Sequence, residues 1–189
     1  MRKSLWLIIV CVLFFGASFA QAKKSWHSMT QEERNQKIIE RAVRDIGKNT
    51  GLRCGKWVEK VIMDVSRAYR NPVLSSFDGR KYPNANGCNT STNIVCVTKD
   101  KSFPIEKAHA GWIVCYFKKY KQTGIRNERT KIEGHAMIIK RVSATGIEVV
   151  DCNAVGPTTV GTRFLSFKEF YDRVLVIRGK KEYHLYYVL

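Results

Sequence analysis

Two stretches in the first third of the chain have apolar residues at helical spacing. The earlier one follows Thr30-Gln-Glu-Glu33, a capping box that opens a helix, and Gly47 closes it. Its apolar stripe is Ile38, Ile39, Ala42, Val43 and Ile46. The later one covers roughly residues 54–69, with an expected buried face of Trp57, Val58, Val61, Ile62, Val65 and Ala68. The pattern therefore predicts two amphipathic helices.

From residue 111 onward the period changes from helical to extended. Residues 111–117 predict a strand, residues 118–133 a charged loop, and residues 135–142 and 147–153 a hairpin around Ala144-Thr-Gly146. Further strands are expected at residues 158–165, 174–177 and 183–189, and a second capping box at Ser166-Phe-Lys-Glu169 opens one helical turn through Asp172.

Residues 71–110, between these two regions, are irregular in pattern. Helices followed by an antiparallel meander predict an α+β fold, in which N-terminal helices pack on one side of a small curved antiparallel sheet.

The N-terminus has the pattern of a cleaved signal peptide over residues 1–22. Arg2 and Lys3 precede an apolar run at residues 5–15, and small residues in an A-x-A pattern follow. A membrane anchor is the alternative, but a spanning helix needs about 20 apolar residues and this run is shorter. We therefore expect a secreted or periplasmic protein with one domain, residues 23–189, and no membrane span once the leader is removed.

The net charge of the chain indicates which classes of molecule the protein is expected to bind. The chain has 33 Lys and Arg against 16 Asp and Glu, a net charge of +17, and removal of the leader takes away Arg2 and Lys3 and no acidic residue, which leaves +15. Such a domain is attracted to anionic polymers or acidic membrane surfaces. Nucleic acid is not expected, because the basic residues are scattered and no aromatic–basic motif occurs. A merely well-solvated basic surface is the alternative.

Of the six cysteines, Cys11 leaves with the leader, so five remain. An odd number in an oxidising compartment leaves at least one thiol unpaired or bonded to another chain. The four other than Cys54 are Cys88, Cys96, Cys115 and Cys152, and they allow three pairings, of which Cys88 with Cys96 is the first to consider. The spacings of Cys and His do not fit a zinc site, and no cofactor is expected.

Three segments carry residues suited to nucleophilic thiol chemistry. Cys54 stands where a loop becomes a helix, and the amides and dipole at such a position stabilise a thiolate. His135 begins a strand, and Asp151 and Asn153 end the next one, where strand alternation puts both on one face and Cys152 on the other. Across a hairpin, either could orient the imidazole. Taken singly, each residue also has an ordinary structural explanation.

The runs Cys54-x-x-Trp57-Val58, Gly134-His135-Ala-Met-Ile-Ile and Val-Val-Asp151-x-Asn153 resemble the CHAP-type cysteine, histidine-dependent amidohydrolases and peptidases, a branch of the papain-like, NlpC-like superfamily. The resemblance spans most of residues 50–189. It implies that Cys54 is the nucleophile, that His135 is the base, and that Asp151 and Asn153 are orienting groups. Many relatives have Gln directly before the nucleophile, where this chain has Arg53, so the backbone N–H of Cys54 is left as the donor to an oxyanion.

The activity implied by this resemblance is cleavage of amide bonds in cell-wall peptidoglycan, by an endopeptidase or an amidase. One alternative is a secreted thiol protease or toxin that acts on proteins. Another is a non-catalytic basic module that binds anionic envelope polymers. The sequence assigns neither the bond that is cut, nor an immunity or inhibitor protein, nor the oligomeric state.

Overall fold

The computed structural model describes residues 24–66, 94–97, 103–122, 129–174, 176–177, 180–181 and 183–189. The signal peptide predicted at residues 1–22 lies outside this set. Within the described ranges, no helix has both the length and the apolar composition needed to cross a membrane. The helical elements are η1 (Trp26–Ser28), α2 (Gln31–Val43), α3 (Cys54–Ser66), η3 (Ile105–Lys107) and α5 (Phe167–Arg173). The strands are β1 (Ile94–Cys96), β2 (Ile113–Gln122), β3 (Arg129–Val142), β4 (Gly146–Gly156), β5 (Thr159–Ser166), β6 (Val176–Ile177), β7 (Lys180–Lys181) and β8 (Tyr183–Val188).

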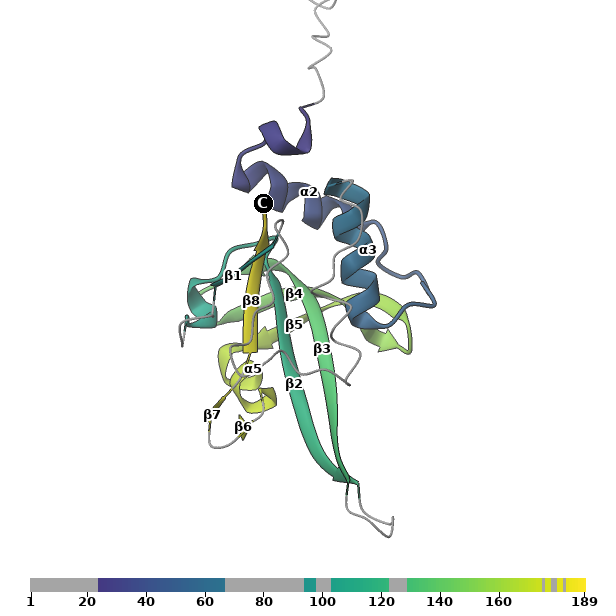
Figure 1. Ribbon diagram of the computed structural model, residues 1–189, viewed down its shortest axis with the longest axis vertical. Helices are drawn as coiled ribbons and strands as arrows, with labels where there is room; N and C mark the ends of the chain where they lie inside the picture. Colours follow the sequence, from purple (N-terminus) through teal and green to yellow (C-terminus); the bar gives the residue numbers. More distant parts are fainter. Residues whose placement is uncertain are drawn as a thin grey trace, which may run out of the picture.

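The strands confirm an α+β fold around an antiparallel sheet. Six of them form one sheet in the order β1-β8-β2-β3-β4-β5, and β6 pairs separately with β7. The predicted hairpin of β3 and β4 is present, and both capping boxes form, at Thr30 with Glu33 and at Ser166 with Glu169. Figure 1 shows α2 and α3 beside the sheet, with the long β2–β3 ribbon extending beyond the other strands.

The charged loop predicted for residues 118–133 is wrong over most of its length. β2 continues to Gln122, β3 begins at Arg129, and the two pair without a break from Ile113–Ile138 to Gln122–Arg129. Pairing between two antiparallel strands satisfies the backbone groups of both without requiring an apolar face. A charge-rich pattern therefore does not exclude a strand.

Both faces of the sheet are covered, which differs from the expected packing on one side. On one face, α2 and α3 bury Ile38, Trp57 and Val61 against the sheet residues Ile113, Ala136, Ile138, Val150, Cys152 and Val160. On the other face, Phe170 of α5 and Ile105 of η3 join Val114, Met137, Ile139, Ile147, Val149 and Leu165. The two predicted N-terminal helices thus form one layer, and the short later helices cover the opposite one.

The stripe predicted for α2 is only partly buried. Ile38 and Ala42 are fully buried, whereas Val43 and Ile46 are 36% and 39% exposed, and Asn35 and Asp45 are buried instead. The helix comes so close to the sheet at Asn35 that a Cβ on Gly111 would lie 2.5 Å from the Asn35 Cβ. Gly111 also has a φ of 83°, which only glycine adopts without strain. Close approach at this point explains why a polar residue occupies part of the buried stripe.

The predicted disulfides are tested only in part. Cys115 and Cys152 are buried thiols, so two bridges using all four of the candidate cysteines do not form in the structure. Cys88 lies outside the described residues, and the pairing of Cys88 with Cys96 lies outside them as well.

Candidate functional site

Cys54 is the first residue of α3. The carbonyl of Arg53 accepts the first helical hydrogen bond, from the N–H of Trp57 at 2.9 Å. Trp57, Val58, Val61 and Ile62 are buried and hold the helix against β3 and β4. The backbone N–H groups at such a helix start have no partner within the helix. The sequence therefore builds a half-buried thiol at the positive end of a rigid helix, as predicted.

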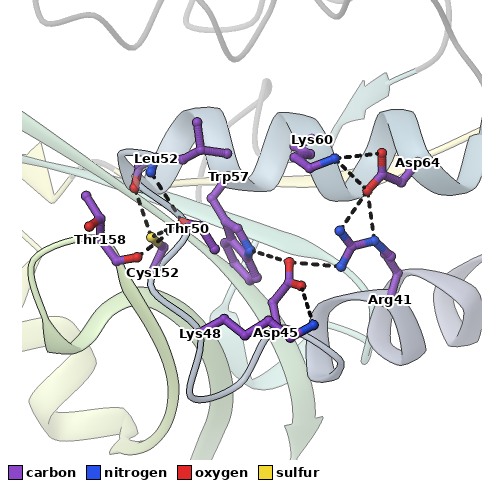
Figure 2. Close-up of polar contacts among 10 residues, drawn as sticks. All are labelled: Arg41, Asp45, Lys48, Thr50, Leu52, Trp57, Lys60, Asp64, Cys152 and Thr158. Carbon is purple, nitrogen blue, oxygen red and sulfur yellow. Dashed lines mark hydrogen bonds and ion pairs between the residues drawn. The ribbon is translucent and has the colours of Figure 1, made fainter.

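An ion-pair network fixes α3 to α2 (Figure 2). The indole Nε1 of Trp57 donates to Asp45 Oδ2 at 3.1 Å, and Arg41 Nη1 lies 2.8 Å from the same oxygen. Arg41 also reaches Asp64 further along α3, with Nη2 2.7 Å from Oδ2. Asp45 is 7% exposed, and these partners compensate the cost of burying its charge. The network sets where the start of α3, and so Cys54, stands relative to the sheet.

The loop that leads into Cys54 is joined to the ends of β4 and β5 (Figure 2). The backbone N–H of Thr50 donates to the Thr158 carbonyl at 2.9 Å, and the Thr50 hydroxyl donates to the same oxygen at 3.1 Å. The Cys152 thiol donates to the Leu52 carbonyl at 3.1 Å. Two residues before Cys54, the chain is therefore anchored to the strand that carries Asp151.

His135 and Asp151 meet where β3 and β4 separate. Pairing of the two strands runs from Val142–Ile147 to Ile138–Val150, with a shift of register between Arg141 and Ile139, and stops there. Asp151 lies one residue beyond the last pair, on the same side of the sheet as His135 and diagonally across from it. His135 Nε2 lies 2.9 Å from Asp151 Oδ1, and Asp151 is fully buried. Of the two residues between which the sequence left the choice open, Asp151 is therefore the one that lies beside the His135 ring.

Asn153 has a different place from the one predicted. Its φ of 108° interrupts the strand alternation, and the register of β4 with β5 shifts between Cys152 and Gly156. Its side-chain oxygen accepts a hydrogen bond from the backbone N–H of Thr158 at 2.9 Å. Because the carbonyl of Thr158 in turn holds Thr50, Asn153 stabilises the turn that anchors the Cys54 loop. The expectation that Asp151 and Asn153 share a regular strand face is wrong, because a bulge intervenes.

Arg163 on β5 is a site residue that the sequence reasoning missed. Its Nη2 lies 3.0 Å from His135 Nε2 and also donates to Asp151 Oδ2 at short range. The signal was present in the pattern of residues 158–165: alternation puts Arg163 on the same strand face as Leu165, which is buried. A charged residue on an apolar face needs a partner, and here the partner is the buried Asp151.

The charges of this cluster shift the pKa values of Cys54 and His135 in opposite directions. Burial alone would raise the pKa of Cys54, but hydrogen bonding to His135, its charge, and the backbone N–H groups of Ala136 and Gly55 lower it. Burial alone would lower the pKa of His135, but Asp151 and Cys54 raise it to about 9. With Nε2 beside Asp151 and Arg163, Nδ1 is left for the sulfur. Each shift favours the charged form of its group, a thiolate on Cys54 and an imidazolium on His135.

Cys115 and Cys152 differ from Cys54 in their acidity. Burial raises the pKa of Cys115 well above its ordinary value, and burial also raises the pKa of Cys152. Because the thiolate is the reactive form, Cys54 is better suited than Cys115 or Cys152 to act as a nucleophile.

The ring of Tyr116 packs beside the imidazole of His135. It is the register partner of His135 in the β2–β3 pair, and the ring centroids lie 5.5 Å apart in an edge-on arrangement. Phe170 of α5 packs on the far side of Tyr116, with ring centroids 6.4 Å apart. The ring of His135 is thus restrained by packing as well as by charge.

Across the described ranges, no group of three or more His, Cys, Asp or Glu side chains is arranged to hold a metal ion. The residues gathered at this site are suited to thiol and proton chemistry of their own. In comparisons with known proteins, no protein family matches the chain, and neither a characterised protein nor a solved structure matches it. The residues of the site are therefore the basis on which a function is inferred.

Proposed function

We propose that this protein is an exported cysteine hydrolase that cleaves amide bonds in cell-wall peptidoglycan. The observation that carries the proposal is the placement of Cys54 at the start of α3, where His135 hydrogen-bonds to its thiol and also contacts the buried Asp151. A nucleophile, a base and a group that orients the base are the three parts that thiol catalysis requires. A helix that carries the thiol against an antiparallel sheet that carries the histidine also agrees with the resemblance to the papain-like, NlpC-like enzymes.

The reaction begins with attack of the Cys54 sulfur on the amide carbonyl carbon. The new C–S bond pushes the carbonyl electrons onto oxygen, where the backbone N–H of Cys54 is placed to donate a hydrogen bond. Collapse of this intermediate breaks the C–N bond, and the imidazolium gives its Nδ1 proton to the departing amine. A thioester on Cys54 remains, and His135 is neutral.

Water completes the cycle. Neutral His135 takes a proton at Nδ1 from the attacking water, the new C–O bond forms, and the C–S bond breaks to return the thiolate. The net change is one amide and one water converted to a carboxylic acid and an amine. Base assistance of this kind contributes about 10² to 10⁴ in rate.

Peptidoglycan is proposed as the substrate on two grounds. The first is the resemblance in the sequence around Cys54, His135 and Asp151. The second is charge, because a domain with a net charge of +15 after leader removal is attracted to an anionic cell wall, and the leader pattern directs the protein towards it. A secreted protease would use the same residues, so the choice between the two substrates is decided by assay.

The test is digestion of purified sacculi with the mature protein, followed by mass analysis of the soluble fragments. New amino termini within the peptide indicate an endopeptidase, and separated sugar and peptide chains indicate an amidase. The matched pair of variants is Cys54→Ala and Cys115→Ala, each of which removes one thiol from the same layer of the core. We expect loss of cleavage only in Cys54→Ala, with binding to sacculi retained.

Other outcomes overturn the proposal in distinct ways. Cleavage of a denatured protein substrate with intact sacculi indicates a protease acting on proteins. Equal function of Cys54→Ala and the parent protein indicates a binding module. Loss of cleavage in Cys115→Ala with an unchanged melting temperature would move the chemistry away from Cys54.

A further inference from the structure

Arg163 contacts both His135 and Asp151, the two residues whose side chains meet at the site. One of its nitrogens, Nη2, lies 3.0 Å from His135 Nε2 and also donates to Asp151 Oδ2. Its side chain is 26% exposed, whereas the carboxylate it contacts is fully buried. The two oxygens of Asp151 are therefore divided, with Oδ1 facing the imidazole and Oδ2 facing the guanidinium.

The charges of the four groups balance. The thiolate of Cys54, the imidazolium of His135, the carboxylate of Asp151 and the guanidinium of Arg163 sum to zero. Without Arg163, the other three groups would sum to −1, and uncompensated buried charge is costly. An arginine stays protonated throughout the working pH range, so its charge is a constant part of the site.

The position of Arg163 Nη2 also disfavours protonation of His135 at Nε2. When Nε2 bears a hydrogen, the cationic N–H donor of Arg163 stands 3.0 Å away with nothing to receive its hydrogen on the ring. When Nε2 has its lone pair, Nη2 can donate to it. The arginine thus disfavours the doubly protonated ring that Asp151 favours.

We propose that Arg163 is a positioning residue, which holds Asp151 through Oδ2 and keeps the imidazole of His135 from retaining its second proton too firmly. The inference depends on the proposed thiol chemistry, because a general acid is efficient only if it releases its proton near the working pH. Asp151 stabilises the imidazolium, and Arg163 limits that effect.

The groups that face His135 come from four elements. Cys54 approaches from α3, Asp151 from β4, Arg163 from β5, and the phenol of Tyr116 from β2. Burial raises the pKa of Tyr116, so it stays neutral where His135 titrates; Arg173 of α5 hydrogen-bonds to this phenol. Removal of Arg163 therefore changes one fixed charge beside an otherwise unaltered set.

The test follows the His135 ring by NMR as pH is raised, with its resonance assigned by its loss in His135→Gln. In Arg163→Met, we expect the titration midpoint of His135 to move upward by about one pH unit or more, because a like charge at close range is removed. Cleavage of sacculi should fall about tenfold. The matched control is Arg141→Met: Arg141 is an exposed arginine of the same sheet, paired with Glu148, and its loss should leave the midpoint unchanged.

A second variant keeps the test decisive if Arg163→Met does not fold. Arg163→Lys keeps the charge but has no guanidinium fork, so its midpoint should stay at the parent value while cleavage falls. An unchanged midpoint in Arg163→Met, or an upward shift in Arg163→Lys, overturns the inference. The NMR readout needs no substrate, so a parent protein that fails to cleave sacculi defeats the proposed function without deciding the role of Arg163.

Discussion

The two halves of the β3–β4 pair have different roles. In the first half, from Val142–Ile147 to Ile138–Val150, the strands are paired and Ile138, Ile139 and Val149 are fully buried. In the second half the strands separate, and each keeps a neighbour only on its outer side, β2 for β3 and β5 for β4. That half carries His135 and Asp151, with Arg163 beside them on β5.

This difference shows how a small sheet can hold charged groups in its interior. Where two strands stop pairing, their facing edges leave room for a helix start, and backbone groups such as the N–H of Ala136 are directed to the sulfur of Cys54 instead of to the next strand. The paired half holds the positions of both strands. We expect substitutions in the paired half to lower stability and substitutions in the separated half to lower activity.

The largest expected effect is that of His135→Gln. Removing the base should reduce cleavage of sacculi by about 10⁴ or more, because the members of such a unit act together. The melting temperature should change by only a few degrees, since the ring is partly exposed. Measurement of cleavage rate and of thermal unfolding on the same preparation checks both parts. A variant with substantial activity would assign the base to another group.

Asp151→Asn should have the next largest effect, a loss of about 10² to 10⁴ in cleavage rate. The amide keeps the shape of the carboxyl group but does not stabilise the imidazolium. The His135 pKa, raised to about 9 in the parent, should therefore fall. Since the thiolate–imidazolium pair exists between the pKa values of Cys54 and His135, its pH range should shrink from the alkaline side. The alkaline limb of the pH profile for cleavage of sacculi measures this change, and an unaltered alkaline limit would contradict it.

Ile138→Ala tests the paired half. A fully buried isoleucine reduced to alanine should cost about 2 to 5 kcal/mol in the free energy of unfolding, measured by urea denaturation. Cleavage per folded molecule should stay within a few-fold of the parent. A large loss of activity at unchanged stability would show that the two halves are not separable in this way.

Asp45→Asn tests the network that positions α3, and we expect a loss of about 3 kcal/mol in unfolding free energy at neutral pH. Although burial opposes it, contact with Arg41 and Trp57 lowers the pKa of Asp45 in the folded state. A carboxyl group of this kind stabilises the fold above its unfolded pKa and stops doing so as pH falls through its folded pKa. The difference between variant and parent should therefore disappear in acid. Urea titrations at neutral pH and near pH 3 compare the two, and a constant difference would contradict this account.

Asn153→Gly should have the smallest effect. Glycine relieves the positive φ of this position but removes the acceptor for the N–H of Thr158, so the two effects on stability oppose each other and leave a change within about 1 kcal/mol. Cleavage should stay within about threefold of the parent. A loss comparable to that of Asp151→Asn would restore Asn153 as an orienting group for His135.

The sequence predicted the elements on which the site is built because their signals are local. The capping box at Thr30, the buried face of α3 and the apolar periods of the β3–β4 hairpin each depend on a few neighbouring residues. The extent of the β2–β3 ribbon was missed, because strand pairing can continue through charged residues once the hairpin is formed. The bulge at Asn153 was missed as well, since a single positive φ leaves no trace in the alternation.

The candidate site was predicted in part for the same reason. Cys54 stands at the start of a helix, as expected, whereas His135 lies within β3 and not at its predicted start, because the strand begins at Arg129. The type of both elements was specified by the pattern, so their meeting could be anticipated. Arg163 and Asp45 could not be assigned in this way. Each is a charged residue whose burial depends on a partner from another element, Asp151 for Arg163 and Trp57 for Asp45. Long-range pairing of this kind follows from the tertiary fold.

The bare backbone at Gly111 has a consequence for the chemistry of Cys54. Gly111 has no side chain, and Asn35 of α2 occupies the space that a Cβ at position 111 would need. The absence of that Cβ allows the helical layer to lie this close to the sheet. The methyl group of an alanine at position 111 would clash with Asn35 and push α2 away from the sheet. Because Arg41 of α2 is ion-paired with Asp64 of α3, a displacement of α2 would also move α3 and the Cys54 sulfur. Gly111 would thus affect the position of Cys54 without contacting it.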